Sequence, residues 1–365
     1  MAVTHAFPAL TNEPDSDAIF WAATSFSQRP ATIHPLQSTM SLSSRREFTK
    51  LALAALPGAS LFSNAGFLRA VQAAGKPNSK VSGVQIGLNV PYSFGAGVTT
   101  EDEILKNCLA LGLSGVELRT QSVEVFLGAP VDQVYGKKKD KKDKKAKDEP
   151  KADPAPKGVS LREWRKTAPL DRVKDFRSKW ENAGVLIEIV KVDGIFKMSD
   201  EEVDYAFALA KGLGARAIST EISHDEADLK RLGSFADKHQ FFVGYHGHAT
   251  TTPEHWEAAF ALAKFNGANV DLGHFVAGNN ISPVPFITKY HHRVTHVHVK
   301  DRGFNNGPSV PFGQGNTPLK EVLQLIRDNK WNIQATIEFE YKVPADSDRM
   351  KELAKTIQFC REALA

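Results

Sequence analysis

The chain has 365 residues, of which 42% are hydrophobic and 24% charged, and its formal net charge is +4. This composition is typical of a soluble globular protein and excludes a chain that is disordered throughout or built mainly of membrane spans. The charge is local, because residues 137–157 hold ten lysines against five acidic residues, and the remainder is close to neutral. A basic face is not indicated, and we expect no nucleic-acid partner. The two cysteines, Cys108 and Cys360, are too few for a disulfide framework and are expected to be buried apolar residues.

The most specific short motif is Ser44-Arg45-Arg46-Glu47-Phe48-Thr49-Lys50. It resembles the twin-arginine export signal, S-R-R-x-F-x-K, at every defined position. An apolar run over residues 51–62 and small residues up to Ala74 follow it, in the order that export signals share. The run is shorter than the ~20 residues of a membrane-spanning helix, so no stable span is expected in the mature form. We predict a signal peptide over residues 40–74, an unstructured stretch or start-site error over residues 1–39, and a periplasmic or extracellular protein.

From about residue 80 onward, apolar or β-branched runs alternate with segments of helical period. The runs are Val84–Val90, Gly115–Arg119, Val185–Val190, Arg216–Glu221, Phe241–His246, Ala268–Leu272, Val294–Val299 and Ile333–Phe339. Helical segments between them include Glu101–Leu111, Glu202–Leu213 and His255–Phe265. Such alternation predicts parallel β/α units. We therefore predict an α/β fold, a single-domain (β/α)8 TIM barrel over residues 80–365. An open doubly wound sheet is the alternative, but no glycine-rich dinucleotide fingerprint follows the first run.

The longest gap between predicted strands lies between the second and the third. It contains a lysine-, aspartate- and proline-rich segment over residues 136–158. Such a composition offers too little apolar area to offset the entropy of ordering, so the segment is predicted to be a disordered insertion. The segment is either a solvated loop or a polycationic tether to an anionic surface or polymer, and the sequence does not decide between them.

Ionisable residues gather where the later predicted strands end, which in a TIM barrel is the end that forms active sites. They are Glu221, His246, His248, Asp271, His274, His296, His298, Lys300, Asp301, Glu338 and Glu340. Because strand side chains alternate between two faces, His296 with His298 and Glu338 with Glu340 should point into the barrel. Several carboxylates in one barrel mouth would repel each other without a cation. We therefore predict one bound divalent ion, Mn²⁺, Mg²⁺, Co²⁺ or Zn²⁺. The predicted metal ligands are Glu221, Asp271, His298 and Glu338.

His296 and Glu340 are expected to lie deeper and to support the ligands. Glu117 and Arg119, at the end of the second predicted strand, are expected to form a structural pair.

Several short motifs in order resemble the sugar phosphate isomerase/epimerase group of the xylose isomerase-like barrels. They are Gln85-Ile86-Gly87, Tyr92-Ser93-Phe94, Gly115-Val116-Glu117-Leu118, Gly244-Tyr245-His246-Gly247-His248, Asp271 with His274, His296–Asp301, Phe312-Gly313-Gln314-Gly315 and Ile337-Glu338. The resemblance runs from about residue 83 to the C-terminus, outside the lysine-rich insertion. It implies that Glu221 and Glu338 act as the acid/base pair, besides binding the metal, in chemistry through an enediolate. The expected substrate contacts are His246, His248, His274, Lys300 and Arg302.

Two departures from that group concern substrate contacts. Phe304 stands where the ketose 3-epimerases have an arginine, with Arg302 nearby, and Gly247 replaces their usual asparagine. We predict an exported isomerase or epimerase of a non-phosphorylated keto sugar or sugar derivative, since phosphorylated sugars are cytoplasmic. The alternatives are a metal-dependent lyase or hydratase on 3-keto-glycosides and, from another class, a non-catalytic sugar-binding barrel. An apurinic-site endonuclease is disfavoured, because the third predicted strand has no histidine and the core has no basic face.

Overall fold

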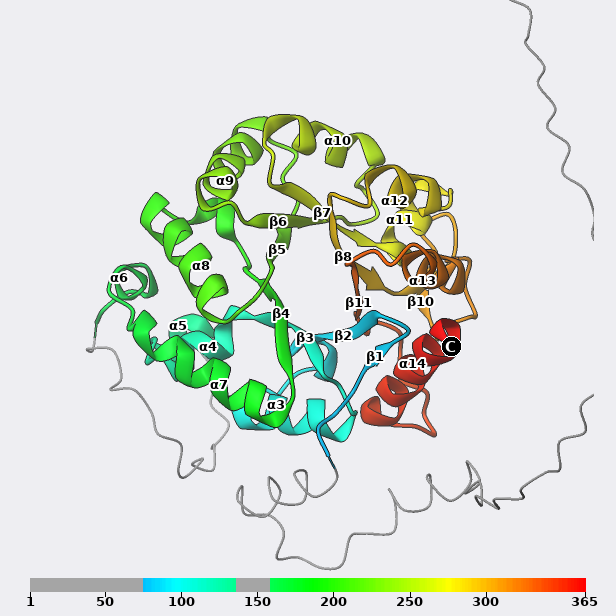
Figure 1. Ribbon diagram of the computed structural model, residues 1–365, viewed down its shortest axis with the longest axis horizontal. Coiled ribbons are helices and arrows are strands. Elements are labelled where there is room, and N and C mark those ends of the chain that lie inside the picture. The colour runs from blue at the N-terminus through cyan, green and yellow to red at the C-terminus, as the bar shows by residue number, and fades with distance from the viewer. Residues whose placement is uncertain (1–74, 136–157) are drawn as a thin grey trace, which may run out of the picture. The chain divides into compact units, whose positions relative to one another are not determined.

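In the computed structural model, eight parallel strands close into a barrel surrounded by helices (Figure 1). The structure describes residues 75–135 and 158–365. The barrel strands are β2 (Val84–Val90), β3 (Gly115–Arg119), β4 (Leu186–Lys191), β5 (Ala217–Glu221), β6 (Phe242–His246), β7 (Asn266–Asp271), β8 (Val294–Val299) and β11 (Gln334–Ile337). The barrel closes because β2 pairs in parallel with both β3 and β11. This confirms the predicted TIM barrel and excludes the open doubly wound sheet.

Helices follow most of the barrel strands and form the outer ring. They are α3 (Glu101–Ala110), α4 (Thr120–Phe126), α5 (Val131–Val134), α6 (Leu161–Lys166), α7 (Val173–Ala183), α8 (Asp200–Gly212), α9 (Glu226–His239), α10 (Pro253–Leu262), α11 (Leu272–Asn279), α12 (Val284–Tyr290), α13 (Leu319–Asp328) and α14 (Arg349–Leu364). Single 3-10 turns lie at Tyr92–Phe94, Leu170–Arg172 and Ile195–Lys197. Within the described residues, none of these helices is both long and apolar enough to cross a membrane.

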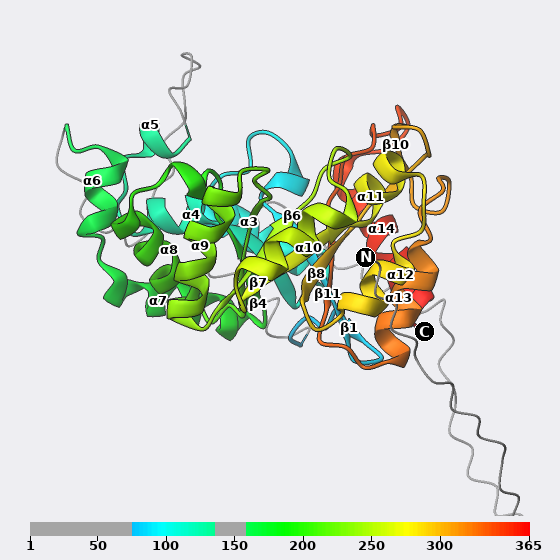
Figure 2. The same ribbon diagram turned by 90° about the horizontal axis from the view of Figure 1, so that it is seen from above.

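Three minor strands lie outside the barrel. The hairpin partner β1 (Lys80–Val81) pairs antiparallel with β2, and β9 (Asp301–Arg302) pairs antiparallel with β10 (Ser309–Val310). Figure 2 shows β1 at one end of the barrel and β10 and α5 at the other. The second end is the one at which the barrel strands finish. The loops that follow the strands therefore gather there.

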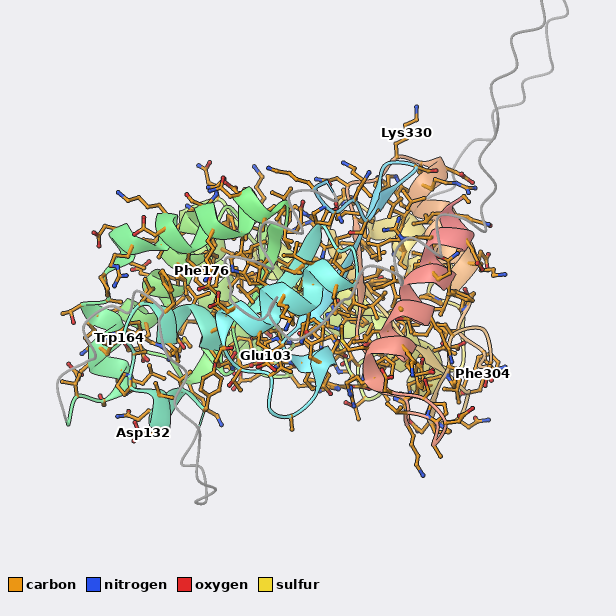
Figure 3. All side chains as sticks on the ribbon, turned by 90° about the horizontal axis from the view of Figure 1, so that it is seen from below. Glu103, Asp132, Trp164, Phe176, Phe304 and Lys330 are labelled. Carbon is orange, nitrogen blue, oxygen red and sulfur yellow. The ribbon has the colours of Figure 1, made fainter. Side chains whose placement is uncertain are left out.

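The apolar core fills the layer between the strands and the helices. It contains alternate strand residues such as Val297 and Val299 together with helix residues such as Phe176 of α7, labelled in Figure 3. Cys108 and Cys360 lie in this layer, buried and unpaired, as expected. The inside of the barrel is polar instead, with buried Asn269, His296, His298, Gln334 and Thr336. A polar interior costs free energy unless its groups are paired.

Predicted and observed strand bounds differ by at most two residues. The largest differences are at β7, which begins at Asn266 and not at Ala268, and at β11, which ends at Ile337 and not at Phe339. The side chain of Asn266 donates to the carbonyl of Ala259 and accepts from the Tyr245 hydroxyl, so a polar residue sits in a buried strand. The predicted export signal and residues 136–157 of the predicted insertion lie outside the described residues.

Candidate metal centre

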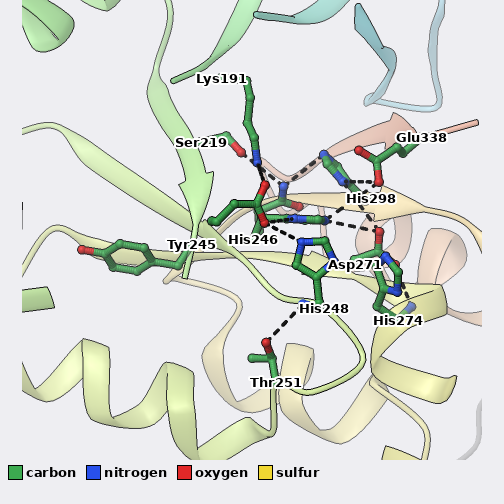
Figure 4. Close-up of polar contacts among 12 residues, drawn as sticks. Lys191, Ser219, Tyr245, His246, His248, Thr251, Asp271, His274, His298 and Glu338 are labelled. Atoms are coloured by element: carbon green, nitrogen blue, oxygen red, sulfur yellow. Dashed lines mark hydrogen bonds and ion pairs between the residues drawn. The ribbon is translucent and has the colours of Figure 1, made fainter. Parts of the chain in front are cut away.

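Four buried side chains face one another at the carboxyl ends of β6, β7, β8 and β11 (Figure 4). His246, Asp271, His298 and Glu338 each offer one ligand atom, and these four atoms lie within 4.8 Å of one another. Nδ1 of His298 is 3.4 Å from Glu338 Oε2 and 3.7 Å from Asp271 Oδ2. Nε2 of His246 is 3.5 Å from the same Asp271 oxygen. We call these four residues the ligand cluster.

The ligand cluster contains three of the four predicted metal ligands. Glu221, the fourth, belongs to a neighbouring group with His246 and His248. Its Oε2 accepts hydrogen bonds from His246 Nδ1 at 2.9 Å and His248 Nε2 at 2.7 Å. Its Oε1 is 2.5 Å from the ammonium of Lys191, which is buried at the end of β4. Glu221 therefore reaches the cluster through His246, which the sequence had suggested only as a substrate contact.

The donor set of the ligand cluster suits a divalent metal ion. Two imidazole nitrogens and two carboxylate oxygens are typical ligands of Zn²⁺, Mn²⁺ and Co²⁺. Nδ1 of His298 is completely buried and has no hydrogen-bond partner, although it points at two carboxylates. A buried nitrogen without a partner is costly, and binding of a metal would remove that cost. The residues present therefore fit the predicted ion.

His298 is oriented by a carboxylate from the far side of the barrel. Its Nε2 donates to Glu117 Oε2 at 2.6 Å, and His296 Nε2 lies 3.6 Å from the other Glu117 oxygen. A proton fixed on Nε2 leaves Nδ1 as the atom that faces the ligand cluster, the usual arrangement of a metal-binding histidine. The expected Glu117–Arg119 pair is therefore wrong, because β3 directs Glu117 inward to β8 while Arg119 pairs with Asp193 at 2.7 Å.

Lys300 supplies positive charge beside the ligand cluster. Its buried ammonium lies 3.0 Å from Asp271 Oδ2, 2.8 Å from Glu338 Oε2 and 2.7 Å from Glu340 Oε2. The last two contacts show that Glu338 and Glu340 project from the same side of the chain. Burial would raise the pKa of Asp271, but the charge of Lys300 and the neighbouring His274 holds it well below its usual range. Burial likewise opposes ionisation of Glu338, and His298 and Lys300 hold its pKa well below the usual range.

His274 and Arg302 border the cluster on the side of α11 and β9. The guanidinium of Arg302 donates to His274 Nδ1 at 2.6 Å, and the ammonium of Lys300 is 3.0 Å from His274 Nε2. Burial lowers the pKa of His274 to about 4, so the ring is neutral at neutral pH. Phe304, at the position of the missing arginine, is 42% exposed and lies at the edge of the molecule in Figure 3. Arg302 is thus the guanidinium that reaches this part of the site.

Lys191, Asn89 and Glu117 complete the site and were not among its predicted residues. Asn89 on β2 donates to Glu338 Oε1 at 2.8 Å, and Lys191 holds Glu221. A lysine that ends an apolar strand run is a usable signal, because lysines are rarely buried without a partner. Nothing in the local sequence around Asn89 or Glu117 shows which strand lies opposite, so their partners depend on the closed barrel.

Comparison with known proteins agrees with this architecture. Residues 207–363 match the family of xylose isomerase-like TIM barrels. A curated relative, the inosose dehydratase of Clostridium botulinum, is 26% identical over 157 residues, which cover 37% of this chain and 52% of that protein. The chain thus matches about half the length of this relative.

Two solved structures share the barrel fold. The probable 3-DHS dehydratase of petrobactin synthesis from Bacillus anthracis has a TM-score of 0.52 at 13% identity, over 75% of this chain and 98% of that one. A xylose isomerase domain protein from Planctomyces limnophilus has a TM-score of 0.52 at 15% identity, over 78% of this chain and 97% of that one. At such identities the likeness concerns the fold alone.

Proposed function

We propose that the protein is a metal-dependent enzyme that removes a proton from a carbon next to the carbonyl of a non-phosphorylated carbohydrate. The observation that supports this most directly is the ligand cluster, four buried metal-type ligands within 4.8 Å at the active end of the barrel. A divalent ion bound there would polarise the carbonyl and stabilise the enediolate that forms when the proton leaves. Isomerisation or epimerisation is the outcome if the proton returns to carbon.

The proposed ion is held by Asp271, His298 and Glu338, with either Glu221 or His246 as the fourth ligand. The contacts of His246 support the second arrangement, whereas the family resemblance supports the first. Alanine substitution separates the two: the variant of the true ligand loses bound metal in elemental analysis, and the other retains it. Both roles are consistent with Glu221 staying ionised, because hydrogen bonds from His246 and His248 overcome the opposing effect of burial and lower its pKa.

For the proton transfer itself, Glu338 is the proposed base. It is buried, held ionised by His298 and Lys300, and aligned by the hydrogen bond from Asn89. Glu221 is less suited to be a second base, because Lys191, His246 and His248 all donate to it. Each donor weakens a carboxylate as a proton acceptor, and Glu221 has three hydrogen-bond donors whereas Glu338 has two, Asn89 and Lys300.

Because three donors already contact Glu221, elimination is the second candidate reaction. Loss of water or an alcohol from the enediolate requires an acid on the leaving group, and the candidates beside Glu221 are the buried ammonium of Lys191 and the exposed ring of His248. The pKa of His248 is raised, mainly by its hydrogen bond to Glu221. The name of the relative, inosose dehydratase, fits this class of reaction. Product analysis separates the outcomes, because elimination yields an unsaturated or deoxy product and epimerisation yields an isomer.

The deciding experiment measures exchange of carbon-bound protons with deuterium oxide by NMR, in a panel of ketoses and keto-glycosides. Wild-type protein with metal should exchange one such proton in at least one sugar. Glu338→Gln keeps an oxygen ligand and an acceptor for Asn89, but it cannot act as a base, so exchange should fall about 10²–10⁴-fold. Glu257→Gln on α10, where Glu257 contacts Lys289 and Tyr290, is the matched control.

Exchange near the wild-type rate in Glu338→Gln with metal bound would make Glu338 a ligand only. If the wild-type protein exchanges no carbon-bound proton in any of the sugars, the enzymatic proposal is overturned and a sugar-binding barrel is favoured. The predicted export is part of the proposal, since it is the reason for a substrate without phosphate.

A further inference from the structure

A cavity of about 730 Å³ opens at the active end of the barrel, beside the ligand cluster. Its walls come from the loop after β2, residues 91–99, from the end of β3, from α5 and from the segment after β11. None of the four cluster residues lines it, but Glu340 does. The cavity is therefore a separate space that shares one wall with the site described above.

A short chain of contacts connects this cavity to the ligand cluster. The hydroxyl of Tyr92 donates to Glu340 Oε1 at 2.8 Å, and Glu340 Oε2 lies 2.7 Å from the ammonium of Lys300. The same ammonium contacts Glu338 and Asp271 of the cluster. A molecule that reacts at the cluster would therefore extend past Lys300 and Glu340 into the cavity if it had a second part.

The walls combine an open aromatic ring with hydrogen-bonding groups. Tyr92 is 43% exposed, and the Arg119 guanidinium lies 4.8 Å from the centre of its ring. The side-chain oxygen of Gln121 is buried and has no hydrogen-bond partner. Arg349 donates to the carbonyl of Ser93, and among the described residues no carboxylate pairs with it. Aromatic surface with a few convergent polar groups is the usual lining of a small-molecule site.

The size of the cavity exceeds what one sugar ring requires. Its 730 Å³ corresponds to roughly 24 water volumes of ~30 Å³ each. A covalently bonded atom of a sugar occupies less volume than a separate water molecule, so the cavity has room for two sugar rings. Apolar surface at Val98 and Val134 lies in the same lining, and sugar rings present C–H faces to such surface and to aromatic rings.

We propose that this cavity is a binding subsite for a second ring, so that the substrate is a glycoside of two or more rings and not a free monosaccharide. The proposal rests on the proposed function for the identity of the reacting ring. The reacting ring occupies the ligand cluster, and the second ring lies against Tyr92 with its hydroxyls on Gln121, Arg119 and Arg349. The neighbouring charges of Glu340 and Lys300 separate the two positions.

The test compares substrates that differ only by the second ring. The probes are fructose against lactulose, and methyl 3-keto-β-glucoside against 3-ketocellobiose, in which the keto group is on the non-reducing ring. Ala96→Trp and Val134→Trp each fill part of the cavity without touching the cluster, Lys300 or Glu340. Val131→Trp is the matched control, because Val131 begins α5, is 55% exposed and does not line the cavity. Melting temperatures show whether each variant is folded.

We expect the two-ring member of at least one pair to react with a kcat/KM roughly tenfold or more above that of its one-ring partner, the range that contacts in an apolar pocket provide. Both cavity variants should remove that advantage and leave the one-ring rate unchanged, and Val131→Trp should alter neither. An equal kcat/KM within both pairs, or an equal loss for both members in the variants, would overturn the subsite.

A binding measurement keeps the two proposals distinct. Calorimetry with methyl glucoside and methyl cellobioside, which have no free carbonyl to react, compares one ring with two rings in wild type and Val134→Trp. If no sugar exchanges its proton but methyl cellobioside binds more tightly and loses that advantage in Val134→Trp, the proposed chemistry fails and the subsite stands. If exchange occurs but methyl cellobioside and lactulose show no advantage, the subsite fails and the chemistry stands.

Discussion

Replacing Lys300 by Met tests whether the buried carboxylates depend on cationic charge. Lys300 contacts Asp271, Glu338 and Glu340 at 2.7–3.0 Å, and its side chain is almost fully buried. Methionine has a similar length but no charge, so three carboxylates lose their shared partner. Removing one partner of a buried ion pair costs about 3–5 kcal/mol. At about 2 °C per kcal/mol for a chain of this size, the melting temperature in a chelator should fall by roughly 6–10 °C.

A divalent ion should restore much of that loss, because it brings positive charge to the oxygens of Asp271 and Glu338. Ligand binding to the native state adds about 2.7 kcal/mol when the ligand is at 100 times its Kd. Differential scanning fluorimetry with EDTA and with Mn²⁺ should therefore show a larger metal-induced rise for Lys300→Met than for wild type. Lys342→Met is the control, because Lys342 is exposed and has no ion pair among the described residues.

Two results would refute parts of this reasoning separately. A variant that melts within about 2 °C of wild type in EDTA would show that the carboxylates are not strained without Lys300. If the variant is destabilised and no divalent ion raises its melting temperature, the electrostatic role of Lys300 is supported and the proposed metal site is contradicted.

Three further predictions concern other parts of the chain. Glu117→Gln should weaken metal binding about 10–100-fold in competition with a fluorescent chelator, because Glu117 fixes the ring of His298, and an unchanged Kd would show that it does not. Replacing Arg45 and Arg46 by Lys should retain the precursor in the cytoplasm on immunoblots of fractionated cells, whereas normal export would exclude the twin-arginine route. Deleting residues 137–157 should change the melting temperature by only a few degrees, since each doubling of a surface loop costs about 0.6 kcal/mol, and a larger fall would show that the segment contributes to the fold.

The strands were predictable because apolar periodicity is a local property. Val84–Val90, Gly115–Arg119 and Val294–Val299 were predicted with the bounds that the structure has. The gathering of Asp271, His298 and Glu338 also followed from sequence, because parallel strands place their carboxyl ends on one side.

The partners of individual side chains were not predictable in this way. Glu117 and His298 are 181 positions apart, and their contact depends on how β3 and β8 face each other across the closed barrel. His246 and Glu221 end neighbouring strands, so either could have faced the cluster, and the local sequence does not show that Lys191 contacts Glu221.

The ligand cluster and the neighbouring cavity are built from different parts of the chain. Its ligand cluster comes entirely from β6 onward, whereas most of the cavity wall comes from β2, β3 and α5 together with their loops. A mutational library confined to residues 91–99 and 131–135 would therefore reshape which molecules fit while every proposed ligand stays in place. Under the proposed function, this separation would make the protein a practical scaffold for changing the substrate range by selection while the reaction stays the same.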